Sequence, residues 1–178
     1  MFMPRVVLQP WACNTGYVDV YTYSMRNQIP ITRTEQANLF PLPCACQNLR
    51  RATRVVTRIY DEELRKAGLE ITQFGLLTAL SLVGEANQKR LSGGFAMDST
   101  TLTRTLGLLR KHGWVSVLPG KDRRERLFSL TKAGKRQMAA AQPHWEQAER
   151  RLRRELGEAG CISMKHAVSR VTKAALAA

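Results

Sequence analysis

The sequence predicts a mainly α-helical domain that carries one small β-hairpin. After residue 43, apolar side chains recur every three or four positions in segment after segment, which is the period of an amphipathic helix. Glycines end most of these segments, as they commonly do in helices. Two short apolar runs flank Pro119 and Gly120 instead, and this pattern favours two strands joined by a turn. The chain has 178 residues, enough for one domain and an appendage.

Residues 1–43 are predicted to form an N-terminal arm, extended or poorly ordered, ahead of a single domain at 44–178. The arm is rich in proline, carries few charges and shows no helical period. A second methionine, Met25, raises the hypothesis that translation starts there.

The domain opens with two predicted helices. The first spans 44–67 and ends at Gly68, because its apolar positions follow one another at near-heptad steps. The second begins at Thr72, whose hydroxyl suits an N-cap, and ends at Gly84. The apolar positions are Leu49, Ala52, Val56 and Ile59 in the first helix, and Phe74, Leu77, Leu80 and Leu82 in the second.

Two capped helices follow, joined by a glycine-containing turn. Asn87 is predicted to cap a short helix over 88–91, which the Ser-Gly-Gly sequence at 92–94 closes. Asp98 then caps a helix over 98–112 that stops at Gly113. A short helix, a turn and a second helix in this order predict a helix-turn-helix.

A hairpin and two long helices complete the chain. The hairpin is predicted at about 114–131, and Thr131 suits the N-cap of a helix over 132–156. Pro143 predicts a kink in that helix. The basic run at 149–155 is interpreted as its solvated face. A last helix over 161–176 follows a break marked by Gly157 and Gly160.

The predicted 98–112 helix has leucines on one side and only small or cationic side chains on the other. Small hydroxyl side chains let a helix lie deep in the DNA major groove, and arginine can bond guanine O6 and N7 in a bidentate pair. Backbone amides near the helix start also favour a phosphate. We therefore predict a recognition helix, and the basic hairpin after it makes the unit a winged helix-turn-helix. The leucines are Leu102, Leu106 and Leu109, and the opposite face holds Thr100, Arg104, Gly107 and Lys111.

The charge balance is consistent with a polyanionic partner. The chain has 28 Lys and Arg against 14 Asp and Glu, a net charge of +14, which attracts nucleic acid or an acidic membrane surface. No stretch approaches the length of apolar sequence that spans a bilayer, so no membrane partner is expected. The N-terminus makes a poor signal peptide, and four cysteines are too few for a secreted disulfide scaffold, so we expect a cytoplasmic protein.

The sequence GKDRRERLFSLTKAGK, at this distance after DSTTLTRTLGLLRKHGW, resembles the wing of the MarR family of bacterial winged-helix transcriptional regulators. In that family an Asp-x-Arg turn leads into a strand that ends Leu-Thr-x-x-Gly. The segment ITQFGLLTAL resembles the second helix of the family, and the likeness covers about 44–176. The segment LSGGF is shorter and richer in glycine than the usual third helix. The matching wing positions are Asp122, Arg124, Leu130, Thr131 and Gly134.

The resemblance implies a sequence-specific transcriptional regulator, more often a repressor than an activator, that binds double-stranded DNA as a homodimer. The helices at 44–67, 132–156 and 161–176 would interleave with those of the partner over a pseudo-palindromic operator. Asp122 is expected to orient a guanidinium group of the wing. The residues expected to contact DNA are Ser99, Thr100, Thr101, Thr103, Arg104, Lys111, Lys121, Arg123, Arg124 and Arg126.

The resemblance also implies a small aromatic effector, bound where the first, second and fifth helices meet the DNA-binding unit. Tyr60, Phe74, His144 and Trp145 are the candidate lining residues. Packing in the core or at the dimer interface is the favoured alternative for these side chains.

Three cysteines are candidates for redox control. Cys44 and Cys46 stand at the start of the first helix near Arg50 and Arg51, an environment that lowers the pKa of a thiol. In the dimer implied by the resemblance, a disulfide between subunits through Cys161 would act as a peroxide switch. Inert cysteines are favoured over this hypothesis, and a thiophilic metal at the Cys-x-Cys pair is favoured least.

No catalytic constellation is found in the sequence, and neither a cofactor nor a metal ion is expected. The three histidines stand far apart, and the LSGG sequence at 91–94, also found in transport ATPases, has no accompanying phosphate-binding loop. The sequence therefore predicts a DNA-binding regulator and not an enzyme. The alternative is a basic architectural DNA-binding protein without strong sequence specificity.

Overall fold

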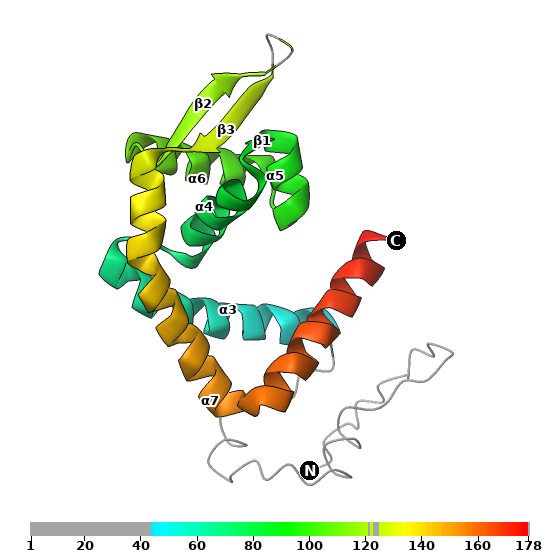
Figure 1. The fold of residues 1–178 in the computed structure, drawn as a ribbon. Coiled ribbons are helices and arrows are strands. Elements are labelled where there is room, and N and C mark those ends of the chain that lie inside the picture. The colour runs from blue at the N-terminus through cyan, green and yellow to red at the C-terminus, as the bar shows by residue number, and fades with distance from the viewer. Residues whose placement is uncertain (1–43, 121, 123–124, 178) are drawn as a thin grey trace, which may run out of the picture. The chain divides into compact units, whose positions relative to one another are not determined.

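The computed structural model describes residues 44–120, 122 and 125–177 (Figure 1). The predicted arm at 1–43, with Met25, and the wing residues Lys121, Arg123 and Arg124 lie outside the described residues. The elements are α3 Ala45–Leu64, the 3-10 helix η1 Arg65–Ala67, α4 Ile71–Val83, β1 Glu85–Asn87, α5 Gln88–Phe95, α6 Ser99–Lys111, β2 Val115–Pro119, β3 Arg126–Leu130 and α7 Lys132–Leu176. This mainly helical fold with a small antiparallel sheet confirms the predicted fold class.

The first two helices end where the sequence predicts, but the second has a different N-cap. Gly68 and Gly84 both take positive φ values, 71° and 74°, which glycine adopts without strain. Glu70, and not Thr72, caps α4: its carboxylate accepts from the N3 amide, and the Gln73 side chain accepts from the Glu70 amide at 3.1 Å. Thr72 lies one residue inside the helix, because the reciprocal bonds of Glu70 and Gln73 fix the start earlier.

One predicted core position of α4 is wrong. Leu82 is 82% exposed, whereas Leu76 is fully buried together with Leu77 and Leu80. At 100° per residue, Leu82 lies about 200° around the helix from Leu80, so it cannot share the buried side. Phe74 is buried as predicted.

Both predicted caps of the helix-turn-helix are confirmed. The Asn87 side chain accepts from the Arg90 amide at 2.8 Å, and the Asp98 side chain accepts from the Thr101 amide at 2.8 Å. The short helix is longer than predicted, because α5 continues through the two glycines and ends where Ala96 takes a φ of 47°. Glycine is permissive and does not by itself stop a helix.

The wing hairpin belongs to a three-stranded antiparallel sheet of order β1-β3-β2. Strands β2 and β3 confirm the predicted hairpin, with Val117 opposite Phe128. Strand β1 was not predicted, because three residues are too few to show an alternating pattern. Ala86 pairs with Phe128 from the other side, so β1 attaches the base of the wing directly to the start of α5.

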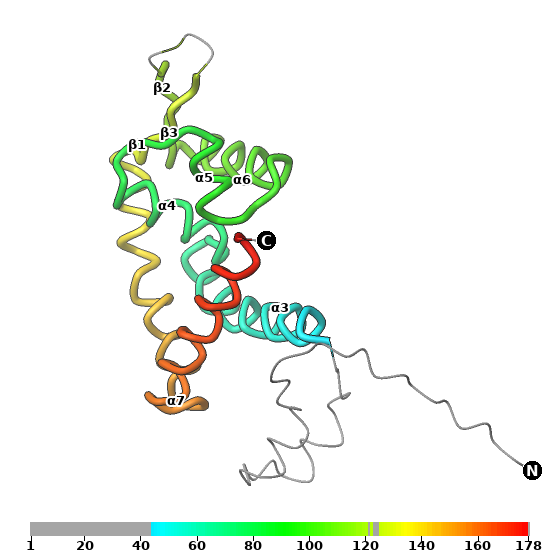
Figure 2. The backbone as a smooth tube through the Cα atoms, turned by 90° about the vertical axis from the view of Figure 1, so that its right-hand side faces the viewer, coloured from blue at the N-terminus to red at the C-terminus, as the bar shows by residue number. Residues whose placement is uncertain are grey.

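The last two predicted helices are two limbs of α7, separated at Gly157. Thr131 caps the first limb, accepting from the Gly134 amide at 3.0 Å. The helix runs through Pro143, and Gly157 is its one internal residue with non-helical backbone angles, φ 68° and ψ 167°. The break predicted at Gly157 and Gly160 is therefore found at Gly157, after which the chain turns back (Figures 1 and 2), whereas the backbone angles at Pro143 stay helical.

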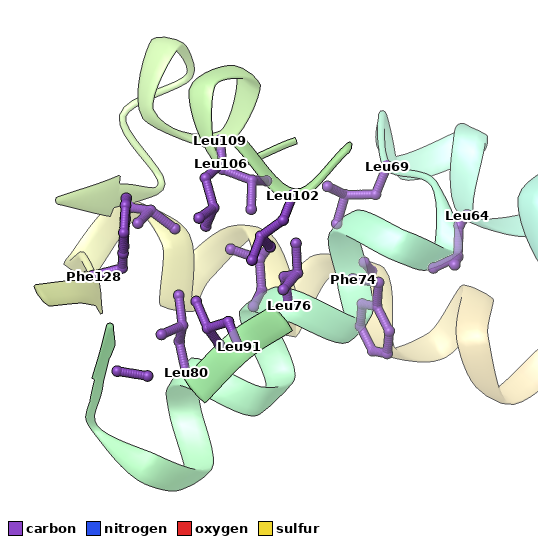
Figure 3. Close-up of a cluster of buried hydrophobic side chains, with 14 of the residues drawn as sticks. Leu64, Leu69, Phe74, Leu76, Leu80, Leu91, Leu102, Leu106, Leu109 and Phe128 are labelled. Atoms are coloured by element: carbon purple, nitrogen blue, oxygen red, sulfur yellow. The ribbon is translucent and has the colours of Figure 1, made fainter. Parts of the chain in front are cut away.

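A leucine-rich core holds α6 against α4 and the sheet (Figure 3). The three leucines of α6 are at most 2% exposed, and each fully buried leucine contributes roughly 1.5–3 kcal/mol. Because this stripe is anchored, the rotation of α6 about its own axis is fixed. The core side chains labelled in Figure 3 are Leu64, Leu69, Phe74, Leu76, Leu80, Leu91, Leu102, Leu106, Leu109 and Phe128.

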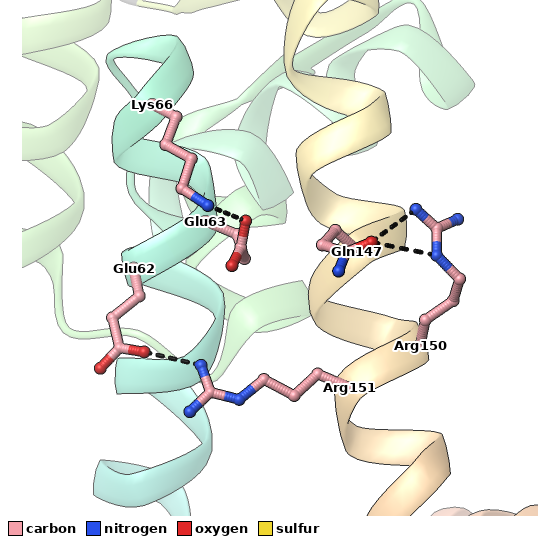
Figure 4. Close-up of polar contacts among 6 residues, drawn as sticks. All are labelled: Glu62, Glu63, Lys66, Gln147, Arg150 and Arg151. Carbon is pink, nitrogen blue, oxygen red and sulfur yellow. Dashed lines mark hydrogen bonds and ion pairs between the residues drawn. The ribbon is translucent and has the colours of Figure 1, made fainter.

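Polar contacts join α3 to the first limb of α7 (Figure 4). Arg151 pairs with Glu62 across the two helices at 2.8 Å, and Arg150 donates to Gln147 at 2.9 Å on its own helix. Such exposed pairs contribute little each. They agree with the interpretation of the 149–155 run as a solvated face.

Within the described ranges, no helix has the length and apolar composition needed to cross a membrane.

Candidate nucleic-acid interface

The face of α6 opposite the leucine stripe is open to solvent. Thr100, Arg104, Gly107 and Lys111 are all exposed, as the sequence predicts for a recognition face. Arg104 forms no ion pair with any residue that the structure describes, so its guanidinium group is available to an incoming acceptor. The face presents hydroxyls and positive charge on a helix whose orientation the core fixes.

The hydroxyl of Thr103 is engaged inside the protein. It donates to the Ser99 carbonyl at 2.6 Å and accepts from Gln88 Nε2 at 2.7 Å. Gln88 also donates to the Ser99 carbonyl at 3.3 Å. Gln88, the first residue of α5, thereby bonds the two helices of the helix-turn-helix to each other, a role that was not predicted from the sequence. The glutamine directly after the Asn87 cap is the sequence feature from which this bond could have been predicted.

The N-terminus of α6 carries its own carboxylate. The hydrogen bond from the Thr101 amide is the main cause that holds the pKa of Asp98 below its usual value. A phosphate at the predicted amides of Ser99 and Thr100 would therefore approach an ionised carboxylate. The side chains of these residues and of Thr101 remain exposed.

The base of the wing is fixed by one asparagine. Asn87 Nδ2 donates to Glu125 Oε1 at 2.6 Å, while its Oδ1 caps α5. The Glu125 carbonyl in turn accepts from the Gly120 amide at 2.9 Å. Asn87 is thus bonded to Glu125, and Glu125 in turn is bonded across the wing turn to Gly120.

The candidate wing residues are only partly described. Arg126 begins β3 and is exposed, and the carbonyl of Asp122 accepts from the Glu125 amide at 2.9 Å. The guanidinium that Asp122 is expected to orient belongs to the part of the wing outside the described residues. That expectation therefore stays a prediction.

A hollow lies between the C-terminal half of α6 and strand β2. Two of its lining residues, Gly107 and Lys111, also belong to the exposed face of α6. The hollow is lined by Gly107, Arg110 and Lys111 from α6 and by Val115, Ser116 and Val117 from β2.

Three of the four candidate effector-lining residues, Tyr60, Phe74 and Trp145, lie in the core or pack against it. Phe74 stacks on Trp145 with ring centroids 6.1 Å apart, and Tyr60 donates to Glu149. Burial and the bond to Glu149 raise the pKa of the Tyr60 hydroxyl well above its usual value. His144 is half-buried. These contacts favour the alternative that the side chains pack the core.

The three described cysteines carry free thiols in the single chain. Cys44 and Cys46 are exposed, whereas Cys161 is buried just after the break in α7. Among the residues that the structure describes, no three His, Cys, Asp or Glu side chains lie together as metal ligands.

Known structures share this arrangement. The M. tuberculosis transcriptional regulator MosR, solved in complex with DNA, is 32% identical to the chain, with a TM-score of 0.68 over 75% of this chain and 97% of MosR. A MarR variant from E. coli complexed with operator DNA has the same fold, with 21% identity and a TM-score of 0.65 over 70% of this chain and 91% of its own. The chain belongs to the MarR family of transcriptional regulators. This confirms the resemblance found in the sequence, and with it the prediction of a regulator and not an enzyme.

A curated relative gives the same assignment over a shorter stretch. This MarR-family chain is 32% identical over 84 residues to the HTH-type transcriptional regulator YwoH of Bacillus subtilis strain 168. The match covers 47% of the chain and 61% of YwoH. No family model matches the chain.

Proposed function

We propose that the protein binds double-stranded DNA sequence-specifically and regulates transcription. The observation that carries the proposal is the exposed face of α6. Its hydroxyl and cationic side chains are suited to the major groove, and a buried leucine stripe fixes their direction. The DNA complexes of MosR and of the E. coli MarR variant support the same partner.

We further propose that the protein acts as a homodimer. The second limb of α7 carries an apolar stripe in three-four spacing that starts in the core at Cys161 and continues onto the surface. Val168 and Val171 of this stripe are 48% and 46% exposed. Leu49, near the start of α3, and Val55, in its middle, are also exposed. A second copy would bury these side chains, and its two-fold symmetry would place the two recognition helices about 34 Å apart on a pseudo-palindrome.

The competing function is that of a basic architectural protein. Such a protein shares the charge but does not need an acid-free face of hydroxyls on a fixed helix. Affinity selection of random DNA by the full chain, followed by competition with unrelated duplex, separates the two functions. A specific regulator should recover one motif and prefer it by roughly 10³-fold or more, whereas equal competition by unrelated DNA would favour the architectural function.

A repressor would act by occupying this motif where it overlaps a promoter. Deleting the gene should then raise transcription from the recovered motif, as a reporter assay would show. Lowered transcription would indicate an activator.

Control by an effector or by oxidation, which the family resemblance implies, is open to two direct tests. A thermal-shift screen with aromatic acids tests the effector, and the packed contacts of Phe74 and Trp145 predict no stabilised hit. For oxidation, the buried position of Cys161 predicts that mild peroxide leaves a monomer band on a non-reducing gel. A linked dimer that is lost in Cys161→Ser would instead establish the redox switch.

A further inference from the structure

Three arginines follow one another at intervals of four residues along α3. Arg50, Arg54 and Arg58 are all exposed. At about 100° and 1.5 Å per residue, they lie within an arc of about 80° and form a line about 12 Å long. Val56 and Ile59 face the other way and pack against the core. We call the three exposed side chains the arginine row of α3.

The arginine row has no counter-charge in the part of the chain that the structure describes. No acidic residue occurs between positions 44 and 60. Asp61 and Glu62, directly beyond the row, are engaged elsewhere: Asp61 accepts from a backbone amide of α4 at 2.8 Å, and Glu62 pairs with Arg151 at 2.8 Å. None of the three arginines forms an ion pair with a described residue.

The row does not stabilise the helix that carries it. Like charges four residues apart destabilise a helix, and the row contains two such pairs. The solvated face of α7 differs, because Arg150 and Arg153 pair there with Glu146 and Glu158. The unpaired row of α3 therefore indicates an anionic partner outside the chain.

The chemistry of the row fits a line of phosphate groups. All three cations are arginine, whose planar guanidinium group bonds phosphate oxygens in bidentate fashion. The neighbouring side chains on this face, Gln47, Arg51 and Thr57, are polar. A protein partner usually needs a buried aromatic or aliphatic anchor, whereas nucleic-acid interfaces are polar and strongly positive. The face therefore favours nucleic acid over an acidic protein.

Two other polyanionic partners are disfavoured. A helix that lies on a membrane presents its apolar face to the lipid, but that face of α3 packs against the core. Single-stranded nucleic acid is held by stacking on aromatic side chains, and Tyr60, the one aromatic residue of α3, is buried. A duplex needs neither feature, because its backbone is bound by charge alone.

The row lies apart from the recognition helix. In both views α4 lies between α3 and α6, and the wing is at the far end of the domain from α3 (Figures 1 and 2). A duplex held by α6 and the wing is therefore not the one that meets the row.

We propose that the arginine row of α3 binds the phosphate backbone of a second DNA duplex, so that the protein holds two duplexes at once. This inference goes beyond the proposed function, because the row makes no base contact and is separate from α6.

A capture experiment tests the second site. The selected operator is immobilised and loaded with the full chain, and a labelled duplex of unrelated sequence is then added. The wild type should retain the labelled duplex. The row variant, with Arg50→Gln, Arg54→Gln and Arg58→Gln, should retain it roughly tenfold less tightly or weaker still. Its slope of log Kobs against log salt for capture should fall by about three per subunit.

The matched control removes three arginines from α7, with Arg150→Gln, Arg153→Gln and Arg154→Gln. These arginines are also exposed, but each pairs with a glutamate. The change in net charge is the same as in the row variant. The control should capture the labelled duplex as the wild type does, and the row variant should bind the immobilised operator as tightly as the control.

Two measurements separate binding from folding. The row variant should keep the sedimentation coefficient of the wild type and a Tm at least as high, because two like-charge pairs are removed. Arg54→Gln alone, in the middle of the row, should lower the salt slope of capture by about one per subunit.

The outcomes are distinguishable from those of the proposed function. No capture by the wild type, or equal capture by the row variant, would overturn the inference and leave the proposed function standing. Polyglutamate that displaces the labelled duplex as readily as unlabelled duplex does would also overturn it and would assign the row to an acidic protein. If the wild type selects no motif, binding of unrelated duplex that is lost in the row variant would still support the second site.

Discussion

Asp98 shows how one side chain supports the recognition helix. Its carboxylate accepts from the Thr101 amide, and this bond lowers its pKa in the folded protein. Asp98→Ala should lower Tm by roughly 2–6 °C, because an N-cap is lost, whereas Asp98→Asn should keep most of the stability. A carboxylate whose folded pKa is lowered stabilises the fold above its unfolded pKa of about 3.9 and ceases to do so as pH falls through the folded value.

The difference between wild type and Asp98→Asn should therefore be constant near neutral pH and shrink below about pH 4. Thermal melts at several pH values would measure it. A difference that grows on acidification would contradict this role of the carboxylate.

Arg104 is the side chain expected to discriminate between bases. Arg104→Ala should cost about 1–3 kcal/mol on the selected operator and relax base choice at one position, because a bidentate guanine contact is lost. Arg126→Ala, on the wing, should weaken operator and unrelated duplex more evenly. Fluorescence anisotropy with both duplexes would measure this, and equal losses in the two variants would refute the division of roles.

At the scale of elements, the junction between the wing and α7 depends on Gly134. A Cβ at this position would lie 2.1 Å from the Trp114 carbonyl oxygen and 2.7 Å from Leu130 Cδ1. Alanine is the better helix former, but the contact with backbone cannot be relieved by a side-chain rotation. Gly134→Ala should therefore destabilise the protein by about 1–3 kcal/mol.

Chemical denaturation would measure this loss. Gly94→Ala, at an open position, should change stability in the opposite direction. An unchanged midpoint for Gly134→Ala would mean that the start of α7 can shift away from the wing. The clash gives a physical reason for the glycine in the Leu-Thr-x-x-Gly sequence.

At the scale of the whole molecule, the exposed stripe on the second limb of α7 predicts the oligomeric state. Val168→Asp should convert a dimer to monomers, because a charge cannot be buried at an apolar interface without a partner. Ile162→Asp is the matched control, since Ile162 is also 48% exposed but lies more than 100° around the limb from Val168. Analytical ultracentrifugation would distinguish the two variants. A wild type that is monomeric at micromolar concentration would refute the proposal.

The sequence by itself determined the helical segments, the wing hairpin and which side of the recognition helix faces solvent. Periodicity carries this information, because a stripe such as Leu102, Leu106 and Leu109 can be buried on only one side of a helix. The caps Asn87 and Asp98 were predictable for a similar reason: the side chain bonds to an amide three residues away, so sequence distance and spatial distance agree.

Only the tertiary structure decided the features that join residues far apart in the chain. Strand β1 exists because Ala86 meets Phe128 of the wing, and three residues carry no pattern of their own. Gln88 engages the hydroxyl of Thr103, which the sequence had assigned to DNA. The hollow at Gly107 depends on β2 lying beside α6, a relation of two elements that no local pattern records. Helix caps and buried stripes depend on residues only a few positions apart, so the sequence shows them. Contacts between elements depend on how the whole core packs, so only the tertiary structure shows them.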